Sequence, residues 1–107
     1  MNDAVCQQTE QTAQLGDRML AWVFALLKRN HITPNAVQEQ MLSSHVRAMA
    51  HRSVSGEPLP EVEAELFDEI SEESMQLAQA VVDEFGNLPV EEAWLLSVHF
   101  EVAKDNL

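Results

Sequence analysis

Apolar residues recur every three or four positions through most of the chain, which is the spacing of helices that bury one face. The first such segment runs from about residue 9 to 30 and is expected to end at the turn "NHITPN". Thr33 and Pro34 then read as an N-cap and a favoured first helical residue, so a second helix is expected to begin there and to end before "SVSGEPLP". Its apolar stripe consists of Val37, Met41, Leu42, Val46 and Met49.

Three further helices are predicted in the second half of the chain. A short one, "EVEAELFDEI", follows Pro58 and Pro60, and a fourth, "EESMQLAQAVVDEF", is expected to be capped by Ser71. The fifth lies within "GNLPVEEAWLLSVHFEVA", where Gly86 ends one helix and Pro89 begins the next. No segment alternates with a period of two residues. The pattern therefore predicts an all-α fold, a compact five-helix bundle.

Length and composition limit the architecture. The chain has 107 residues, enough for one domain, with 46% hydrophobic and 22% charged residues, as in globular proteins. We expect residues 1–8 to be a flexible N-terminus and residues 9–107 to be a single helical domain. The longest apolar run has nine residues, from Met19 to Leu27, so no membrane span is expected. Cys6 is the single cysteine, typical of a reduced, cytoplasmic protein.

The net charge of −12 is unevenly distributed along the chain. Residues 1–53 carry four acidic residues and five of the six basic ones, whereas residues 54–107 carry fourteen acidic residues and Lys104 alone. Such a surface repels phosphate backbones, so direct binding of nucleic acid is not expected. The acidic half is either a solvated face or a docking patch for a basic partner.

Two of the four histidines lie on apolar helix faces. His45 has Met41, Leu42 and Met49 as its neighbours one turn away, and His99 lies in the same way between leucines and a valine. His51 follows His45 by six positions and faces elsewhere, and His31 lies in a turn. Each of the two apolar-face histidines is read either as a satisfied core residue or as a functional one.

Arg52 is a third candidate for the same site. It lies seven residues, or two helical turns, after His45, so its guanidinium can reach back toward a group on that ring. Arginine suits a phosphoryl group because it binds the oxygens with paired hydrogen bonds. The alternative reading is a solvent-facing arginine near a helix C-terminus.

These motifs resemble those of the PTS regulation domain (PRD), a helical module through which the sugar phosphotransferase system controls bacterial regulators. One signature is a histidine in an apolar helix with an arginine seven positions later, here His45 and Arg52 in "SHVRAMAHR". The other is a Leu-Pro pair, two residues, a glutamate and an apolar run ending in histidine, here "LPVEEAWLLSVHF" from Leu88 to His99. The resemblance covers residues 10 to 105.

The resemblance implies a homodimer in which His45 and His99 accept phosphoryl groups near the dimer interface, with Arg52 as the phosphate-pairing residue. The donor would be the histidine phosphocarrier protein or an enzyme II component. Family members usually carry an acidic residue before the first histidine, where this chain has Ser44. Family regulators also join two such domains to a nucleic-acid-binding domain. The resemblance therefore implies a small stand-alone member that acts through an unknown effector protein.

Several alternatives stay open at the level of sequence. One alternative is a phosphorylation-silent scaffold that keeps only the fold, and another is a helical adaptor for a partner helix. His45, His99 and a carboxylate could form a metal site between helices, although no paired ligand spacing marks one. An enzyme is not expected, because the sequence has no glycine-rich phosphate loop and no activated serine or cysteine motif. No cofactor is expected either.

Overall fold

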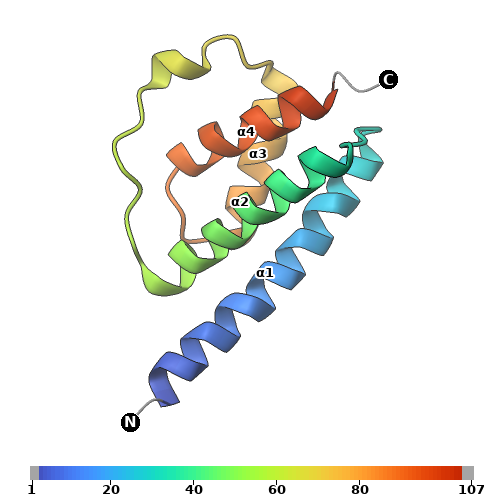
Figure 1. Cartoon of the computed structure of the whole chain (residues 1–107). Helices are drawn as coiled ribbons and strands as arrows, with labels where there is room; N and C mark the ends of the chain where they lie inside the picture. Colours follow the sequence, from blue (N-terminus) through green and yellow to red (C-terminus); the bar gives the residue numbers. More distant parts are fainter. Residues whose placement is uncertain (1–2, 105–107) are drawn as a thin grey trace.

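The computed structural model describes residues 3–104, with side chains from residue 8 onward. Within that range the protein forms four α-helices and no strand, in agreement with the predicted all-α class (Figure 1). One 3₁₀ turn lies between the second and third helices. The elements are α1 (Asp3–Arg29), α2 (Ala36–Ser55), η1 (Ala64–Phe67), α3 (Glu72–Phe85) and α4 (Glu91–Lys104).

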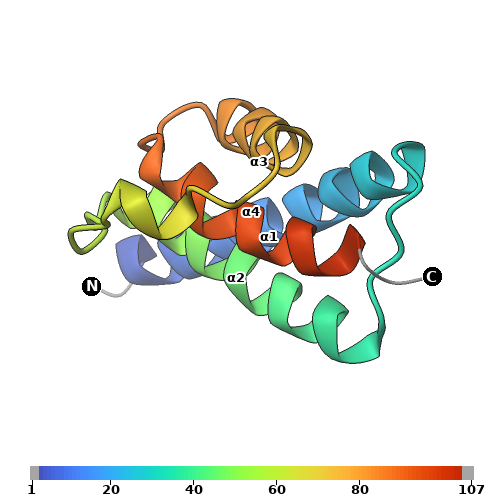
Figure 2. The same ribbon diagram turned by 90° about the horizontal axis from the view of Figure 1, so that it is seen from above.

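The helices form two hairpins that pack against each other. α1 and α2 run antiparallel as one hairpin, α3 and α4 form the other, and α2 also contacts α4 (Figures 1 and 2). The molecule measures 50 × 28 × 21 Å, because the N-terminal end of α1 extends past the rest of the bundle (Figure 1). This arrangement brings α2 and α4, which carry the candidate histidines, side by side.

The core lies where the apolar faces of all four helices meet. Burying a large apolar side chain stabilises the fold by about 1.5–3 kcal/mol. The buried Val46 on α2 and Phe100 on α4 directly follow His45 and His99 in the sequence, so the same packing fixes the histidine backbones. The core includes Met19, Val23, Leu27, Leu42, Val46, Met49, Val81, Leu96 and Phe100.

The N-cap of α3 is the residue that the sequence predicted, whereas the N-cap of α2 is a different one. Ser71 caps α3 as predicted, with its hydroxyl accepting the backbone N–H of Ser74 at 3.2 Å. The predicted cap of α2 was wrong: Asn35, not Thr33, is the N-cap, so Pro34 precedes the helix. The side chain of Asn35 accepts the N–H of Gln38, and the side chain of Gln38 accepts the N–H of Asn35, both at 2.9 Å. This reciprocal pair satisfies two backbone donors, and Thr33 could not form it because the residue three positions later is Ala36.

The predicted third helix was also wrong. Only the η1 turn forms there, and Leu66, which was expected on its buried stripe, is 72% exposed. Glu61, Glu65 and Glu69 would repel one another at successive turns of a helix, and a helix this short repays little of its nucleation cost. The chain therefore crosses this region as an extended strap with a single turn.

The ends of the first two helices reach further than predicted. α1 begins at Asp3, so residues 3–8, expected to be flexible, are helical, while residues 1–2 and the side chain of Cys6 lie outside the described part. α2 continues to Ser55 and stops at Gly56, whose φ of 78° is readily adopted by glycine. Among the described residues no helix is both apolar and long enough to cross a bilayer.

Candidate functional site

The two apolar-face histidines meet across the contact between α2 and α4. The ring centroids of His45 and His99 are 4.9 Å apart, and the ring planes are tilted by 43°. Both side chains are half-buried, and they line a shallow surface depression together with Gln40, Met41 and Ser44. The rings are therefore held by the core on one side and remain accessible on the other.

Both imidazoles are held in the neutral form at neutral pH. Burial, followed by repulsion from His99 and from Arg52, lowers the pKa of His45 from 6.5 to about 4. Burial also lowers the pKa of His99. The Nε2 atom of His45 is buried and has no hydrogen-bond partner among the described residues. A neutral imidazole keeps a lone pair on one nitrogen, which is the state required for nucleophilic attack.

Arg52 lies beside this pair and is held by a glutamate of α4. Its Nε and Nη2 atoms donate to Glu92 Oε2 and Oε1, each at 2.6 Å, so the pair is bidentate. The side chains are 17% and 1% exposed. Glu92 lies in the first turn of α4, where the helix dipole favours a negative charge. The positive charge near His45 is therefore fixed in place by a buried partner.

Comparison with solved structures identifies the relationship. The chain superposes on the crystal structure of a PRD-containing transcription regulator from Lactobacillus casei ATCC 334 with a TM-score of 0.84. The two share 39% sequence identity over 89% of this chain and 85% of that one. This chain belongs to the PRD family. Family models and the curated proteins gave no match.

Both motifs that carried the resemblance meet at one place in the PRD fold. The first contributes His45 and Arg52 from α2, and the second contributes His99 and Glu92 from α4. Sequence reasoning placed the first three residues at the candidate site and missed Glu92 as a member. A signal was present, because a buried arginine requires a carboxylate and Glu92 is the glutamate that follows the Leu-Pro pair.

An apolar surface surrounds the two histidines of the PRD. Four exposed residues of α2 and α4 form it: Val37, Met41, Val98 and Val102, with exposed fractions between 40% and 65%. We call these four residues the histidine-side stripe. Gln38 bridges the two helices here, since its side chain donates to the carbonyl oxygen of Val102 at 3.4 Å.

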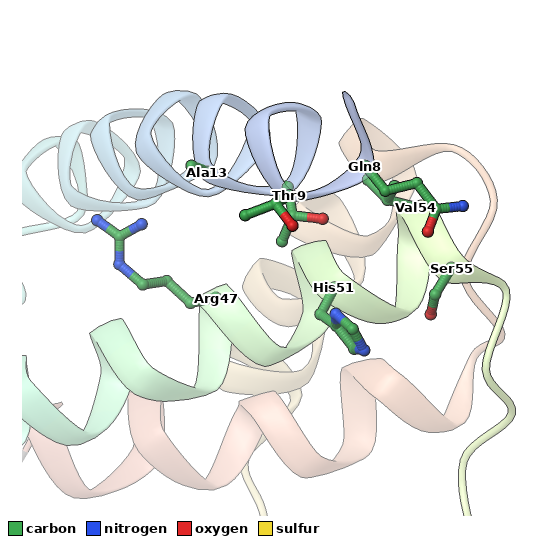
Figure 3. Close-up of a pocket in the computed structure, with 8 residues that line it drawn as sticks. Gln8, Thr9, Ala13, Arg47, His51, Val54 and Ser55 are labelled. Atoms are coloured by element: carbon green, nitrogen blue, oxygen red, sulfur yellow. The ribbon is translucent and has the colours of Figure 1, made fainter. Parts of the chain in front are cut away.

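The remaining histidines lie away from this site, as the sequence predicted. His31 is exposed in the turn between α1 and α2, with a φ of 60°. His51 lines a groove between the N-terminal half of α1 and the C-terminal half of α2, where Gln8, Thr9 and Ser55 also lie (Figure 3). Its Nε2 atom is 3.7 Å from Glu57, and Arg47 of the same groove binds Asp17 at 2.8 Å. The side chains of both ion pairs are exposed, so these contacts contribute little to the stability of the fold.

A metal site at the two histidines gains no support. Within the described part of the PRD, no three side chains of the metal-binding types come together in a way that could hold an ion. Glu92, the carboxylate identified at this site, forms an ion pair with Arg52. The polar groups around the histidines instead form an arrangement of one buried ion pair and two neutral imidazoles.

Proposed function

We propose that this chain is a cytoplasmic PRD regulatory module whose assembly or partner binding is changed by phosphorylation of His45, His99 or both. The observation that carries the proposal is the meeting of two half-buried, neutral imidazoles from α2 and α4 beside a fixed arginine. The proposed phosphodonor is the phosphohistidine of the phosphocarrier protein or, alternatively, an enzyme II component of the sugar phosphotransferase system. The output passes through an effector protein.

The transfer requires only groups that the site and the donor supply. The lone pair of one imidazole nitrogen attacks the phosphorus and forms a new N–P bond. The N–P bond of the donor breaks at the same time, and its electron pair returns to the donor imidazole. The acceptor ring gives up the N–H proton of its other nitrogen to water, and the donor imidazole takes up a proton from water, so charge and protons balance. The role of the protein is to hold a neutral acceptor ring and to stabilise the arriving negative charge.

Phosphorylation would change this surface strongly because it adds nearly two negative charges to an apolar environment. Val98 directly precedes His99, and Met41 lies one helical turn before His45. These two side chains are 40% and 56% exposed, and being apolar they cannot donate hydrogen bonds to a phosphoryl group. The charge must therefore recruit a cation or repel whatever covers the surface. This is the physical basis of a two-state switch.

A second copy of this chain is the proposed occupant of the histidine-side stripe. Four exposed apolar side chains lie on two helices that contact each other, and homodimer interfaces bury apolar side chains of this kind. The proposed homodimer places both histidines of each protomer at the interface, where phosphorylation directly changes the affinity between protomers.

Intact-mass spectrometry tests the phosphoacceptor role. The wild type and the variants His45→Ala, His99→Ala and His51→Ala are incubated with phosphoenolpyruvate, enzyme I and the phosphocarrier, and enzyme II components are added in a second series. We expect a phosphoryl-sized mass gain that the first or second substitution removes and that His51→Ala, the matched control on α2, retains. No gain with any donor contradicts the proposal.

Sedimentation velocity tests the homodimer. Val98→Glu introduces a charge into the histidine-side stripe and is expected to convert a dimer into a monomer. Leu66→Glu is the matched control, since Leu66 is also a strongly exposed apolar residue but lies on η1. A wild-type monomer at all concentrations, or equal effects of the two substitutions, contradicts the proposed interface.

The scaffold alternative predicts a different environment for the histidines. A silent fold would keep both rings fully buried and hydrogen-bonded within the protomer. Here the rings of His45 and His99 are half-buried, and the Nε2 atom of His45 lacks a partner among the described residues. These observations favour the switch over the scaffold.

A further inference from the structure

The guanidinium of Arg52 binds Glu92 through one edge, and a second edge remains available for another hydrogen-bond acceptor. An arginine offers five N–H donors, and here the Nε–H and one N–H of Nη2 bind Glu92. The Nη1 atom and the second N–H of Nη2 form the adjacent edge, which has no partner among the described residues. A planar guanidinium can bind one oxyanion at each of these edges.

The position of Arg52 is fixed at the neighbouring residue of its helix and at the tip of its side chain. The next residue, Ser53, donates its hydroxyl to Asn87 Oδ1 at 2.6 Å, and Asn87 Nδ2 donates to the carbonyl oxygen of Ser53 at 2.9 Å. These bonds tie the end of α2 to the turn before α4. The buried carboxylate of Glu92 then fixes the guanidinium itself.

Arg52 also acts on His45. Its charge is one of the causes that lower the pKa of His45, so the guanidinium lies close enough for the two groups to interact electrostatically. Arg52 follows His45 by seven residues on α2, two helical turns along the same face, so its guanidinium can reach back toward that ring.

We propose that Glu92 is a positioning residue that holds one edge of Arg52 and so presents the second bidentate edge to a phosphoryl group on His45. This inference rests on the proposed function, and it assigns a role to a residue on the helix that carries the other histidine. Arg52 does not have to leave Glu92 when the phosphoryl group arrives. If it left, a buried carboxylate would remain without a partner, which is strongly unfavourable.

The arrangement also couples the two helices. Because Glu92 is on α4 and Arg52 and His45 are on α2, a phosphoryl group bound by Arg52 would be tied through the ion pair to the helix that carries His99. A lysine in place of Arg52 offers a single point charge and cannot serve two oxyanions with fixed geometry.

A double-mutant cycle in the His99→Ala background tests the role of Glu92, because His45 is then the only acceptor of the pair. We expect Arg52→Gln and Glu92→Gln each to slow phosphorylation of His45 by at least about tenfold, the loss of one charge-assisted hydrogen bond. The double variant should be no slower than either single variant, because Glu92 acts through Arg52. Glu101→Gln, at the other end of α4, is the control and should leave the rate unchanged.

Two results overturn the inference. One is an unchanged rate in Glu92→Gln when Arg52→Gln is slow, and the other is a double variant whose loss is the product of the two single losses. A pKa measurement separates this inference from the proposed function. Arg52→Gln should raise the pKa of His45 in the unphosphorylated protein, as measured by NMR titration.

Failure of each claim therefore has its own signature. A wild type that accepts no phosphoryl group contradicts the proposed function, whatever the variants do. An unchanged pKa of His45 in Arg52→Gln contradicts the placement of Arg52 toward that ring, whether or not phosphorylation occurs.

Discussion

Helix α4 carries a bonded glutamate near each end, and the two are satisfied in different ways. Glu92 binds a single charged partner, Arg52, in a buried bidentate pair. Glu101 accepts the hydroxyls of Ser71 and Ser74 at 2.8 Å and the backbone N–H of Ser71 at 3.0 Å, and Lys104 lies 3.4 Å away.

The difference separates a glutamate that only holds two helices together, Glu101, from one that binds a residue of the candidate site, Glu92. Glu101 ties the N-terminus of α3 to α4 through several neutral donors, so removing any one of them leaves the others in place. Glu92 depends entirely on one cation, and that cation also acts on His45. The end of α4 that carries Glu92 is therefore the end where a change of charge affects the candidate site.

The largest effect is expected from breaking the buried pair. Arg52→Met leaves Glu92 buried without a partner and should lower the free energy of unfolding by about 3–5 kcal/mol, measured by urea denaturation. Adding Glu92→Leu should recover most of the loss, because it removes the uncompensated charge. An equally unstable double variant would show that packing, and not charge, explains the first result.

The next effect follows the titration of His45. Its pKa is lowered to about 4 in the folded protein and is near 6.5 when unfolded, so the unfolded chain binds a proton first as the pH falls. The folded protein therefore has its full stability above pH 6.5 and loses stability as the pH falls from 6.5 to 4. The total loss from this one group is at most about 3 kcal/mol.

Urea denaturation of the wild type and His45→Ala between pH 7.5 and 4 checks this prediction. The wild type should lose more stability than the variant over that interval. Parallel curves would mean that the ring is not desolvated in the folded state.

A smaller effect is expected at the other end of α4. Hydrogen bonds from Ser74 and Ser71 lower the pKa of Glu101 to about 2, below its usual 4.5. The carboxylate therefore stabilises the fold fully above pH 4.5, and this contribution falls away toward pH 2. Because the side chain is 29% exposed, Glu101→Gln should lower the free energy of unfolding at pH 7 by only about 1–2 kcal/mol.

Thermal unfolding at pH 7 and at pH 2.5 provides the measurement for Glu101. The difference between wild type and Glu101→Gln should shrink markedly at the lower pH. A difference that is the same at both values would assign the effect to hydrogen-bond geometry and not to charge.

The smallest effect is expected from Lys104→Met, the counterpart of Arg52→Met. Lys104 is 26% exposed, and Glu101 keeps its two hydroxyls and its backbone donor without it. The free energy of unfolding should change by less than about 0.5–1 kcal/mol. A loss as large as that of Arg52→Met would remove the contrast between the two ends of α4.

The sequence predicted those features that depend on neighbours within one helix. The apolar spacing around His45 and His99 placed both rings at a helix surface, and Ser71 was recognised as a cap from its local context. The strap around η1 was predicted wrongly because the spacing of Val62, Leu66 and Ile70 suggested a helix, whereas repulsion among the acidic residues opposes one.

Long-range partners were out of reach of the same reasoning. Arg52 and Glu92 are 40 residues apart, and Ser71 and Glu101 are 30 residues apart. The sequence contains fourteen acidic residues in its second half, and spacing alone does not select which of them binds an arginine of the first half. Only the packing of α2 on α4 makes that selection.

The most direct test of the central claim is an NMR spectrum of the imidazole nitrogens, recorded before and after incubation with the phosphorylated donor. Four histidines report at once, and His31 and His51 serve as internal controls. The account predicts that new phosphoimidazole signals replace those of His45, His99 or both, while the two controls remain unchanged. Phosphorylation of His31 or His51 alone, or an unchanged spectrum with every donor, would contradict it.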